Sequence, residues 1–359
     1  LQAILLSLTV TDMKIITSTH KVPYFSSRIL DQYFKDLKMG IFDIETLGLS
    51  PQFAPLILAG FMTVEKDGSC QITQYFAETP GDERYILEYL REDFDRVDYL
   101  LTYNGKHFDL PFVRKRAERQ SVPSPDCDIY NMDLYLIISG HSEIRNLLKH
   151  LKQKDIEIYM GLAPERADDI SGAESVDLYK AYLSCLDPDQ KEAIAERILL
   201  HNHDDILQLY QLLPILKQVR IHKALNALGF AVGGENGWPS LSVSYIKVNL
   251  SGLSIKGKYR GEGFSYMSYD TFSDNFSCKF DDDKSFEFNL RIERHKGNIF
   301  ANLKMYFDDY EDLKVYPHYL KDFLLLSKGG VHNSLEVNMF VRKFLIKFMN
   351  DHVCPRMLL

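Results

Sequence analysis

The stretch GIFDIETLGLSP, residues 40–51, sets two acidic residues into an otherwise apolar strand pattern. Asp43 and Glu45 are separated only by Ile44, and residues two apart in a β-strand point to the same face. Two carboxylates side by side repel each other unless a positive charge lies between them. The stretch therefore predicts a strand whose paired acids need a cation.

The segments that follow alternate between strand and helix patterns. A second strand, LILAGFMTV, and a third, CQITQYFA, are joined by a hairpin turn at Asp67-Gly68. Helical spacing then alternates with a short buried strand, which predicts a mixed sheet in an α/β domain. The expected short strand is 98–103, and the expected helices are 82–96, 110–120, 143–154, 174–184 and 188–218, the last with a break at Pro214.

The sequence pattern changes near residue 229. Residues 229–239 are rich in glycine and are expected to form a linker. Beyond them, alternating apolar and polar residues predict antiparallel strands up to residue 307, followed by helix over 317–352 with an interruption at Gly329-Gly330. Met13 resembles a natural start, so residues 1–12 are a candidate non-native addition. The expected domains are an N-terminal extension (1–37), the α/β domain (38–228) and a β-rich α+β domain of unassigned role (240–359).

Composition is typical of a globular protein, since 45% of the 359 residues are hydrophobic and 26% are charged. The net charge of −8 argues against a generic basic coat for nucleic acids. Residues 221–359 carry 18 Lys and Arg against 16 Asp and Glu, so the acidic excess precedes them. No apolar run is long enough to span a bilayer. The five scattered cysteines predict neither disulfides nor a structural zinc site, and they favour a cytoplasmic location.

Two further segments carry acidic residues near helices. In TYNGKHFDLPF, residues 102–112, a strand ends in an Asn-Gly turn and Asp109 begins the next helix. In HNHDDILQL, residues 201–209, His201 and Asp205 are four apart and share one helix face. With Asp43 and Glu45 these residues offer four carboxylates and a histidine. Oxygen ligands suit Mg²⁺ or Mn²⁺, and two such ions would serve phosphodiester hydrolysis, with His201 as proton acceptor.

The three segments FDIETLGL, TYNGKHFDLPF and HNHDDILQL, in this order, resemble the three exonuclease motifs of the DEDD superfamily of 3′→5′ exonucleases. The intervening SEIRNLLKHL and DDISGAESVDLYKAYL make the chain most similar to the YprB-type ribonuclease H-like family. The resemblance covers about residues 38–220 and implies a ribonuclease H-like fold. It also implies a metal-dependent nuclease that binds two divalent ions and the ends of single-stranded DNA or RNA.

The resemblance assigns roles to single residues. It implies that Asp43, Glu45, Asp109 and Asp205 bind the two metal ions and are catalytic, together with His201. The same resemblance places Thr46, Leu47 and Gly48 against the terminal nucleotide, while Asn104 and Phe108 shape and line the site. Arg114, in a basic cluster with Lys115, Arg116 and Arg119, is a candidate phosphate contact, although a solvated helix face is the simpler interpretation.

The third motif departs from the family pattern. DEDD enzymes have either a tyrosine four residues before the last aspartate or a histidine five before it, whereas here His201 stands four before Asp205. His203 is therefore kept as an alternative proton acceptor, and Asp204 as an alternative to Asp205. Asp168 and Asp169 resemble a family feature but are expected to be solvated loop acids.

Two other functions stay open on the sequence alone. The same four acids would serve an endonuclease of ribonuclease H type. A non-catalytic nucleic-acid-binding module that keeps the fold is the second alternative, and the irregular position of His201 is the feature in its favour. The substrate polymer, DNA or RNA, is also open, because no element identifies a reader of the 2′-hydroxyl.

Overall fold

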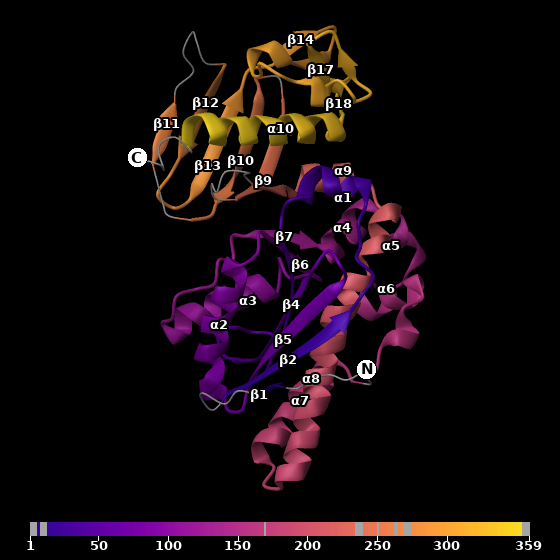
Figure 1. Cartoon of the computed structure of the whole chain (residues 1–359), viewed down its shortest axis with the longest axis vertical. Helices are drawn as coiled ribbons and strands as arrows, with labels where there is room; N and C mark the ends of the chain where they lie inside the picture. Colours follow the sequence, from indigo (N-terminus) through magenta and orange to yellow (C-terminus); the bar gives the residue numbers. More distant parts are fainter. Residues whose placement is uncertain are drawn as a thin grey trace. The chain divides into compact units, whose positions relative to one another are not determined.

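The computed structural model describes residues 6–7, 13–168, 170–233, 240–249, 251–261, 265–268 and 275–353. The chain forms two compact units, which are described separately (Figure 1). Unit 1 consists of Leu1–Arg28 and Leu37–Val219, and unit 2 of Ile29–Asp36 and Arg220–Leu359. Within the part of the chain that the structure describes, every helix is too short or too polar to traverse a bilayer.

Unit 1 is built on one mixed sheet of seven strands in the order β1-β2-β5-β4-β3-β6-β7. Strands β3, β6 and β7 are parallel neighbours, and the other pairs are antiparallel. The strands are β1 (Leu6–Ser7), β2 (Met13–Lys21), β3 (Met39–Thr46), β4 (Leu56–Val64), β5 (Ser69–Ala77), β6 (Tyr99–Thr102) and β7 (Tyr130–Asp133). The helices are α2 (Glu83–Asp95), α3 (Asp109–Gln120), α4 (Leu134–His141), α5 (Ile144–Leu147), α6 (Gln153–Met160), α7 (Gly172–Ser184) and α8 (Pro188–Gln211).

Helices cover both faces of this sheet (Figure 1). Helices α2 and α3 pack on the face that carries Phe42 and Ile44. Helices α7 and α8 pack on the opposite face, where Ile57 and Phe76 are buried. Because side chains alternate along β3, Asp43 and Glu45 point towards α8 while Phe42 and Ile44 enter the other core. The strand alternation thus separates a polar site from an apolar core.

Unit 2 contains only antiparallel strand pairs among its described residues. Six strands form one sheet in the order β11-β12-β13-β10-β9-β8, and β14 to β18 form a second sheet. The strands are β8 (Phe230–Val232), β9 (Leu241–Val248), β10 (Leu253–Tyr259), β11 (Tyr266–Ser268), β12 (Phe276–Phe280), β13 (Ser285–Leu290), β14 (Glu293–His295), β15 (Asn298–Asn302), β16 (Tyr319–Leu320), β17 (Phe323–Lys328) and β18 (Val331–His332). The helices are α1 (Arg28–Phe34, whose first residue belongs to unit 1), α9 (Ile221–Leu228) and α10 (Ser334–Phe348). Phe344 and Phe348 of α10 pack edge-on against Phe288 of the six-stranded sheet.

The expected fold class is confirmed: a mixed sheet with flanking helices, followed by a β-rich antiparallel region. The domain limits differ in detail from the expected ones. Residues 13–21, expected in an extension, form β2 inside the seven-stranded sheet. Residues 230–232, expected in a linker, form β8 and pair with β9. Residues 234–239 of that linker lie outside the described part, as do 1–5 and 8–12.

Two expected helices are wrong in part. Residues 148–152 separate α5 from α6 instead of continuing a helix. Residues 319–332, expected to be helical on both sides of an interruption at Gly329-Gly330, form β16, β17 and β18. The turn between β16 and β17 has positive φ at Lys321 (43°) and Asp322 (68°), and Gly329 and Gly330 turn the chain again with φ of 55° and 85°. Two successive residues with positive φ form a tight hairpin turn, which favours strand pairing over helix.

Candidate active site

The first two acids lie side by side on β3, facing α8. Asp43 pairs with Gly60 of β4 across the sheet, and Glu45 pairs with Leu58. Gly60 has no side chain, and a Cβ there would lie 2.1 Å from Ile206 Cδ1 and 2.3 Å from Asn202 Oδ1. The absence of that side chain lets α8 approach the sheet closely enough to contact Asp43.

Asn202 of α8 contacts Asp43 directly. Asn202 Nδ2 donates a hydrogen bond to Asp43 Oδ2 at 2.9 Å. The Asn202 side chain is fully buried, and its Oδ1 accepts a hydrogen bond from Gln74 Nε2 at 2.9 Å. Gln74 also donates to the backbone carbonyl of Leu199 at 2.8 Å. These bonds fix the amide of Asn202 with its NH₂ group towards the carboxylate.

The third acid, Asp109, is the first residue of α3 and is buried. The turn before it is tight, since Asn104 has a positive φ of 64°. Asp133 stabilises this turn by accepting hydrogen bonds from the backbone N–H groups of Asn104 (2.9 Å) and Lys106 (3.1 Å). Asp133 also accepts one from the N–H of Leu136, at the start of α4. The carboxylate of Asp133 therefore holds the loop that delivers Asp109.

His201 and Asp205 of α8 meet Glu45 on the same side of the sheet. His201 Nε2 lies 3.6 Å from Glu45 Oε1 and 3.7 Å from Asp205 Oδ2. Among the described residues, one ligand atom each of Glu45, His201 and Asp205 lie within 4.8 Å of one another, a spacing that could hold a metal ion. The alternative, His203, points elsewhere: its Nε2 lies 2.9 Å from His20 Nε2 and its Nδ1 lies 3.2 Å from Asp204.

The four acids share one electrostatic environment. Burial raises the pKa of Glu45 to about 7, and burial raises the pKa of Asp109 to about 7. Burial, followed by the charges of Asp205, Asp109 and Glu45, raises the pKa of Asp43 well above its ordinary value. Burial also raises the pKa of Asp205, although His201 and Arg166 oppose it. Carboxylates that destabilise one another's charge in this way form a site that a divalent cation would stabilise.

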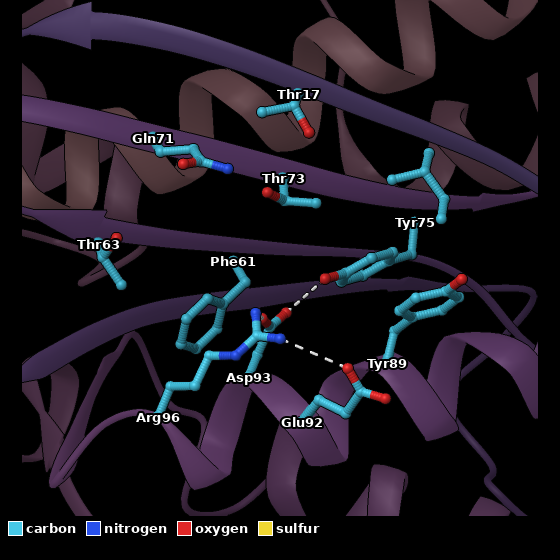
Figure 2. A pocket seen from close by; sticks show the side chains of 11 residues that line it. Thr17, Phe61, Thr63, Gln71, Thr73, Tyr75, Tyr89, Glu92, Asp93 and Arg96 are labelled. Carbon is cyan, nitrogen blue, oxygen red and sulfur yellow. Dashed lines mark hydrogen bonds and ion pairs between the residues drawn. The ribbon is translucent and has the colours of Figure 1, made fainter. Parts of the chain in front are cut away.

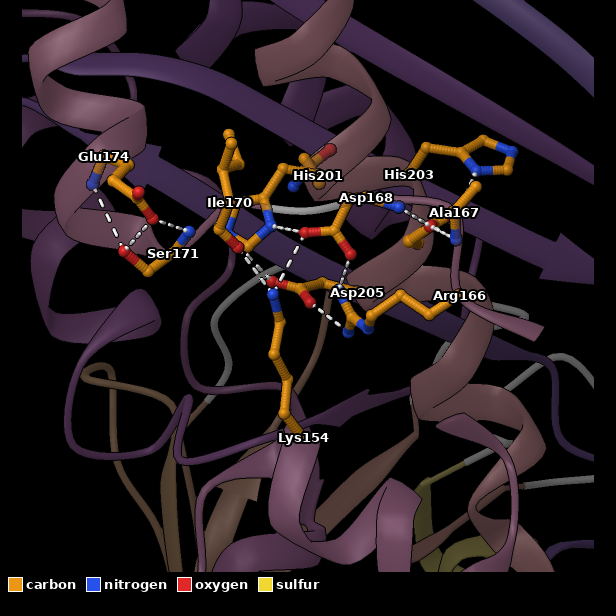
Figure 3. A network of polar contacts seen from close by, with 12 residues as sticks. Lys154, Arg166, Ala167, Asp168, Ile170, Ser171, Glu174, His201, His203 and Asp205 are labelled. Carbon is orange, nitrogen blue, oxygen red and sulfur yellow. Dashed lines mark hydrogen bonds and ion pairs between the residues drawn. The ribbon is translucent and has the colours of Figure 1, made fainter. Parts of the chain in front are cut away.

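The loop between α6 and α7 supplies partners that the motifs did not predict (Figure 3). Asp168 was expected to be a solvated loop acid, but its side chain is only 1% exposed. Asp168 Oδ2 lies 2.6 Å from His201 Nδ1, and its other oxygen accepts a hydrogen bond from Arg166 Nη1 at 2.5 Å. Arg166 also contacts Asp205 Oδ1 at 2.5 Å. The expectation was wrong because the acid pairs with cations that only the folded loop brings near; Asp169 lies outside the described residues.

Asp204 has a different role from its neighbour Asp205. Asp204 Oδ2 accepts hydrogen bonds from the backbone N–H groups of Ala167 at 2.6 Å and Asp168 at 2.9 Å. The adjacent acids of α8 therefore face different partners. Asp205 lies with Glu45 and His201, whereas Asp204 anchors the loop that carries Asp168.

The expected substrate-binding residues lie at the end of β3, in the loop that follows it, in the turn before α3 and on α3 itself. Thr46 Oγ1 donates to the carbonyl of Gly48 at 2.9 Å, and the N–H of Leu47 donates to Pro55 at 3.0 Å, so the loop after β3 is tightly held. Phe108 packs against the core that includes Phe112, 5.5 Å between ring centroids. Asn104 shapes the turn, as described above.

The basic cluster on α3 is divided between surface and core. Arg114 is half exposed and pairs with Asp128 at 2.8 Å. Arg116 was grouped with the solvated helix face, but it is buried and forms two hydrogen bonds to Glu83, from Nε at 2.6 Å and from Nη2 at 2.5 Å. Glu83 lies on a different helix, so the sequence spacing of the cluster could not indicate this pair.

A pocket of about 430 Å³ lies on the opposite face of the same sheet (Figure 2). Phe61 in this pocket pairs across the sheet with Phe42, whereas Asp43 pairs with Gly60 and faces the other way. Tyr75 donates a hydrogen bond to Asp93 of α2 at 2.6 Å within the pocket. The pocket therefore lies on the other side of the sheet from Asp43 and Glu45. Its lining is Ile15, Thr17, Phe61, Thr63, Gln71, Thr73, Tyr75, Tyr89, Glu92, Asp93 and Arg96.

Comparison with known proteins fits this arrangement. Residues 41–217 match the family RNase_H_2, described as the RNase_H superfamily. This part of the chain is therefore similar to the ribonuclease H superfamily, and the match supports a ribonuclease H-like fold. The matched residues include all four acids and His201, so the ribonuclease H-like unit contains the whole candidate site.

Two relatives and one solved structure extend the comparison. A DNA polymerase of Archaeoglobus fulgidus is 27% identical over 221 residues, which cover 52% of this chain and 24% of the polymerase. The uncharacterized protein YprB of Bacillus subtilis is 28% identical over 181 residues, covering 48% of this chain and 40% of YprB. A family B DNA polymerase from Pyrobaculum calidifontis has a TM-score of 0.38 and 22% identity over 50% of this chain and 24% of that chain. The chain spans less than half the length of each of these relatives.

Proposed function

We propose that this chain is a metal-dependent nuclease that acts as a 3′→5′ exonuclease on single-stranded DNA or RNA ends. One observation carries the proposal: four carboxylates, two from β3 and one each from α3 and α8, lie close enough to influence one another's charge within the ribonuclease H-like unit. They are Asp43, Glu45, Asp109 and Asp205. Burial raises the pKa of each of these four groups, so a bound cation would stabilise their ionised forms.

The donor set fits Mg²⁺ or Mn²⁺, because carboxylate oxygens are the ligands that these hard cations prefer. Asp43, Glu45, Asp109 and Asp205 would hold two such ions, which would supply charge stabilisation for the attacking and leaving oxygens of an in-line displacement at phosphorus. Arg166 already neutralises part of the charge on Asp205.

The chain's own side chains would orient the substrate and move the proton. His201 Nε2 faces Glu45 and Asp205 and would accept the proton of the attacking water. The loop at Thr46, Leu47 and Gly48, which internal hydrogen bonds fix in place, would contact the terminal nucleotide. The proposed substrate contacts also include Asn104, Phe108 and Arg114.

The proposal is tested with end-labelled single- and double-stranded DNA and RNA, incubated with Mg²⁺, Mn²⁺ or EDTA. A relative is named a DNA polymerase, which makes DNA the first polymer to test. Stepwise shortening from the 3′ end that EDTA abolishes is the expected result. Internal fragments from an RNA–DNA hybrid would favour the ribonuclease H-type endonuclease instead.

The site assignment is tested by Asp43→Asn, with Asp177→Asn as the matched control because Asp177 is exposed on α7. We expect Asp43→Asn to abolish hydrolysis while the circular dichroism spectrum stays unchanged, and the control to keep full activity. Hydrolysis by Asp43→Asn at the wild-type rate would refute the assignment. Binding of Mg²⁺ and nucleic acid by the wild type without hydrolysis of any polymer would favour the non-catalytic module.

A further inference from the structure

We propose that Asp168 is a positioning residue that fixes the tautomer of His201, with the ring proton on Nδ1 and the Nε2 lone pair facing Glu45 and Asp205. The catalytic value of this arrangement rests on the proposed function, in which Nε2 accepts a proton. The tautomer itself is a property of the protein without substrate. The two can therefore be tested separately.

The geometry around His201 determines which nitrogen carries the proton. Asp168 Oδ2 lies 2.6 Å from His201 Nδ1, a distance typical of a charge-assisted hydrogen bond. An ionised carboxylate only accepts hydrogen bonds, so Nδ1 must donate. Nε2 of the neutral ring is then an acceptor, and it lies 3.6 Å from Glu45 and 3.7 Å from Asp205. A carboxylate behind a histidine commonly fixes both ring orientation and tautomer.

Asp168 is held as an anion by two cationic side chains (Figure 3). Arg166 Nη1 donates to Asp168 Oδ1 at 2.5 Å, and Lys154 Nζ donates to Oδ2 at 3.0 Å. Burial opposes ionisation, but the hydrogen bonds from His201, Arg166 and Lys154 outweigh it and lower the pKa of Asp168. Each carboxylate oxygen therefore accepts a hydrogen bond from an arginine or a lysine, and neither of these side chains can act as an acceptor.

The loop that carries Asp168 is fixed to the helix that carries His201. Asp204 of α8 accepts the backbone N–H groups of both Ala167 and Asp168. The loop is thus attached to α8 at Asp204, three residues after His201, whose imidazole Asp168 orients. These two hydrogen bonds restrain the position of Asp168 relative to His201.

The first experiment reads the tautomer directly by long-range ¹H–¹⁵N NMR of the histidine rings, at a pH where the rings are neutral. His201→Gln identifies the His201 signals among the 11 histidines. We expect the Nδ1–H tautomer in the wild type and a shift towards Nε2–H in Asp168→Asn. An amide at position 168 would direct an NH₂ group towards at least one of its three present donors. Finding Nε2–H in the wild type would overturn the proposal without the need for any variant.

Lys154→Met is the matched control because it removes a different partner of Asp168. We expect this variant to keep the Nδ1–H tautomer, since the carboxylate and Arg166 remain. Loss of the tautomer in Lys154→Met, or its persistence in Asp168→Asn, would show that Asp168 does not set it. Neither outcome depends on nuclease activity. The tautomer can therefore be confirmed in a protein that does not hydrolyse nucleic acid, and it can be refuted in one that does.

The second experiment measures hydrolysis by the full chain. We expect Asp168→Asn to lower kcat by about 10- to 100-fold with little change in KM, because the substrate contacts are intact. Asp168→Glu, which keeps the acceptor, should recover part of the loss. An equal loss in Asp168→Glu and Asp168→Asn, or a loss confined to KM, would contradict a positioning role.

Discussion

Asn202 Nδ2 donates a hydrogen bond to Asp43 Oδ2 at 2.9 Å and so joins α8 to the strand that carries the first acid. Gln74 of β5 completes this connection by donating to Asn202 Oδ1 at 2.9 Å. The sheet thus determines the orientation of an amide on the helix, and the amide supports the charge of a buried acid. The hydrogen bond from Asn202 favours the ionised form of Asp43, which a metal ligand requires, and so opposes the burial that raises the pKa of this acid.

Replacing Asn202 should weaken metal binding. In Asn202→Ala, Asp43 loses a hydrogen bond to a buried charge, which is typically worth about 1.5–3 kcal/mol. We expect the affinity for Mg²⁺, measured by calorimetry at neutral pH, to fall by about tenfold or more. The matched control is Asn146→Ala, on the exposed side of α5, which should bind Mg²⁺ as the wild type does. Wild-type affinity in Asn202→Ala would contradict a role for this bond.

Adding a methyl group at position 60 should destabilise unit 1. The Cβ of Gly60→Ala would lie 2.1 Å from Ile206 Cδ1, so either the buried Ile206 side chain must change conformation or α8 must move away from β4. Overpacking of this kind costs about 1–3 kcal/mol. Urea unfolding should show a lower midpoint for Gly60→Ala, whereas Gly140→Ala, whose Cβ meets nothing within 4 Å, should be neutral or slightly stabilising. Equal midpoints for the two variants would show that α8 is not held by this contact.

The features that could be predicted from sequence are those with local periodicity. Alternation along a strand placed Asp43 and Glu45 on one face, and the helical repeat placed His201 beside Asp205. The helix over 188–211, with the chain turning at Pro214, follows from the same local signals. These patterns depend on the backbone geometry of one segment and not on what packs against it.

The features that could not be predicted depend on contacts between distant segments. Asn202 lies within the third motif, but its role depends on its hydrogen bonds to Asp43 of β3 and Gln74 of β5, which only the folded sheet brings close to it. Asp168 was interpreted as solvated because nothing in its neighbourhood along the chain shows that His201, 33 residues away, would contact it. Such roles require the tertiary packing that brings the partners together.

The metal-free protein should lose stability as the pH rises towards neutrality. Glu45 and Asp109 have ordinary values of 4.5 and 3.8, and burial raises the pKa of both to about 7 in the folded state. Between these values the folded protein binds more protons than the unfolded chain, so the free energy of unfolding falls as the pH rises. We expect the Tm in EDTA to decrease from about pH 4 to about pH 7, the window between the ordinary and the raised pKa values.

Two comparisons isolate this effect from other titrations. Asp109→Asn removes one of the two groups and should give a shallower decrease of Tm with pH. Mg²⁺ should raise the Tm most at the alkaline end of the window, where the bound ion stabilises the ionised carboxylates. A Tm that rises steadily over this range in EDTA would contradict the raised pKa values.

Breaking the buried pair of Arg116 and Glu83 should destabilise the protein more than any surface change on the same helix. Glu83 is fully buried and also accepts the N–H of Leu56 at 2.7 Å, while Arg116 Nη1 donates to the carbonyl of Pro51 at 3.0 Å. Arg116→Met leaves Glu83 as an unpaired buried charge, which costs about 3–5 kcal/mol.

The measurement is urea unfolding of Arg116→Met beside Arg119→Met, which changes an exposed arginine of the same helix. We expect a large fall in the midpoint for the first variant and almost none for the second. Adding Glu83→Gln to Arg116→Met should recover part of the loss, because the buried charge is then gone. Since Pro51 lies in the loop that follows Glu45, Arg116→Met should also lower hydrolysis where the fold survives. Equal midpoints for Arg116→Met and Arg119→Met would show that this ion pair does not support the loop.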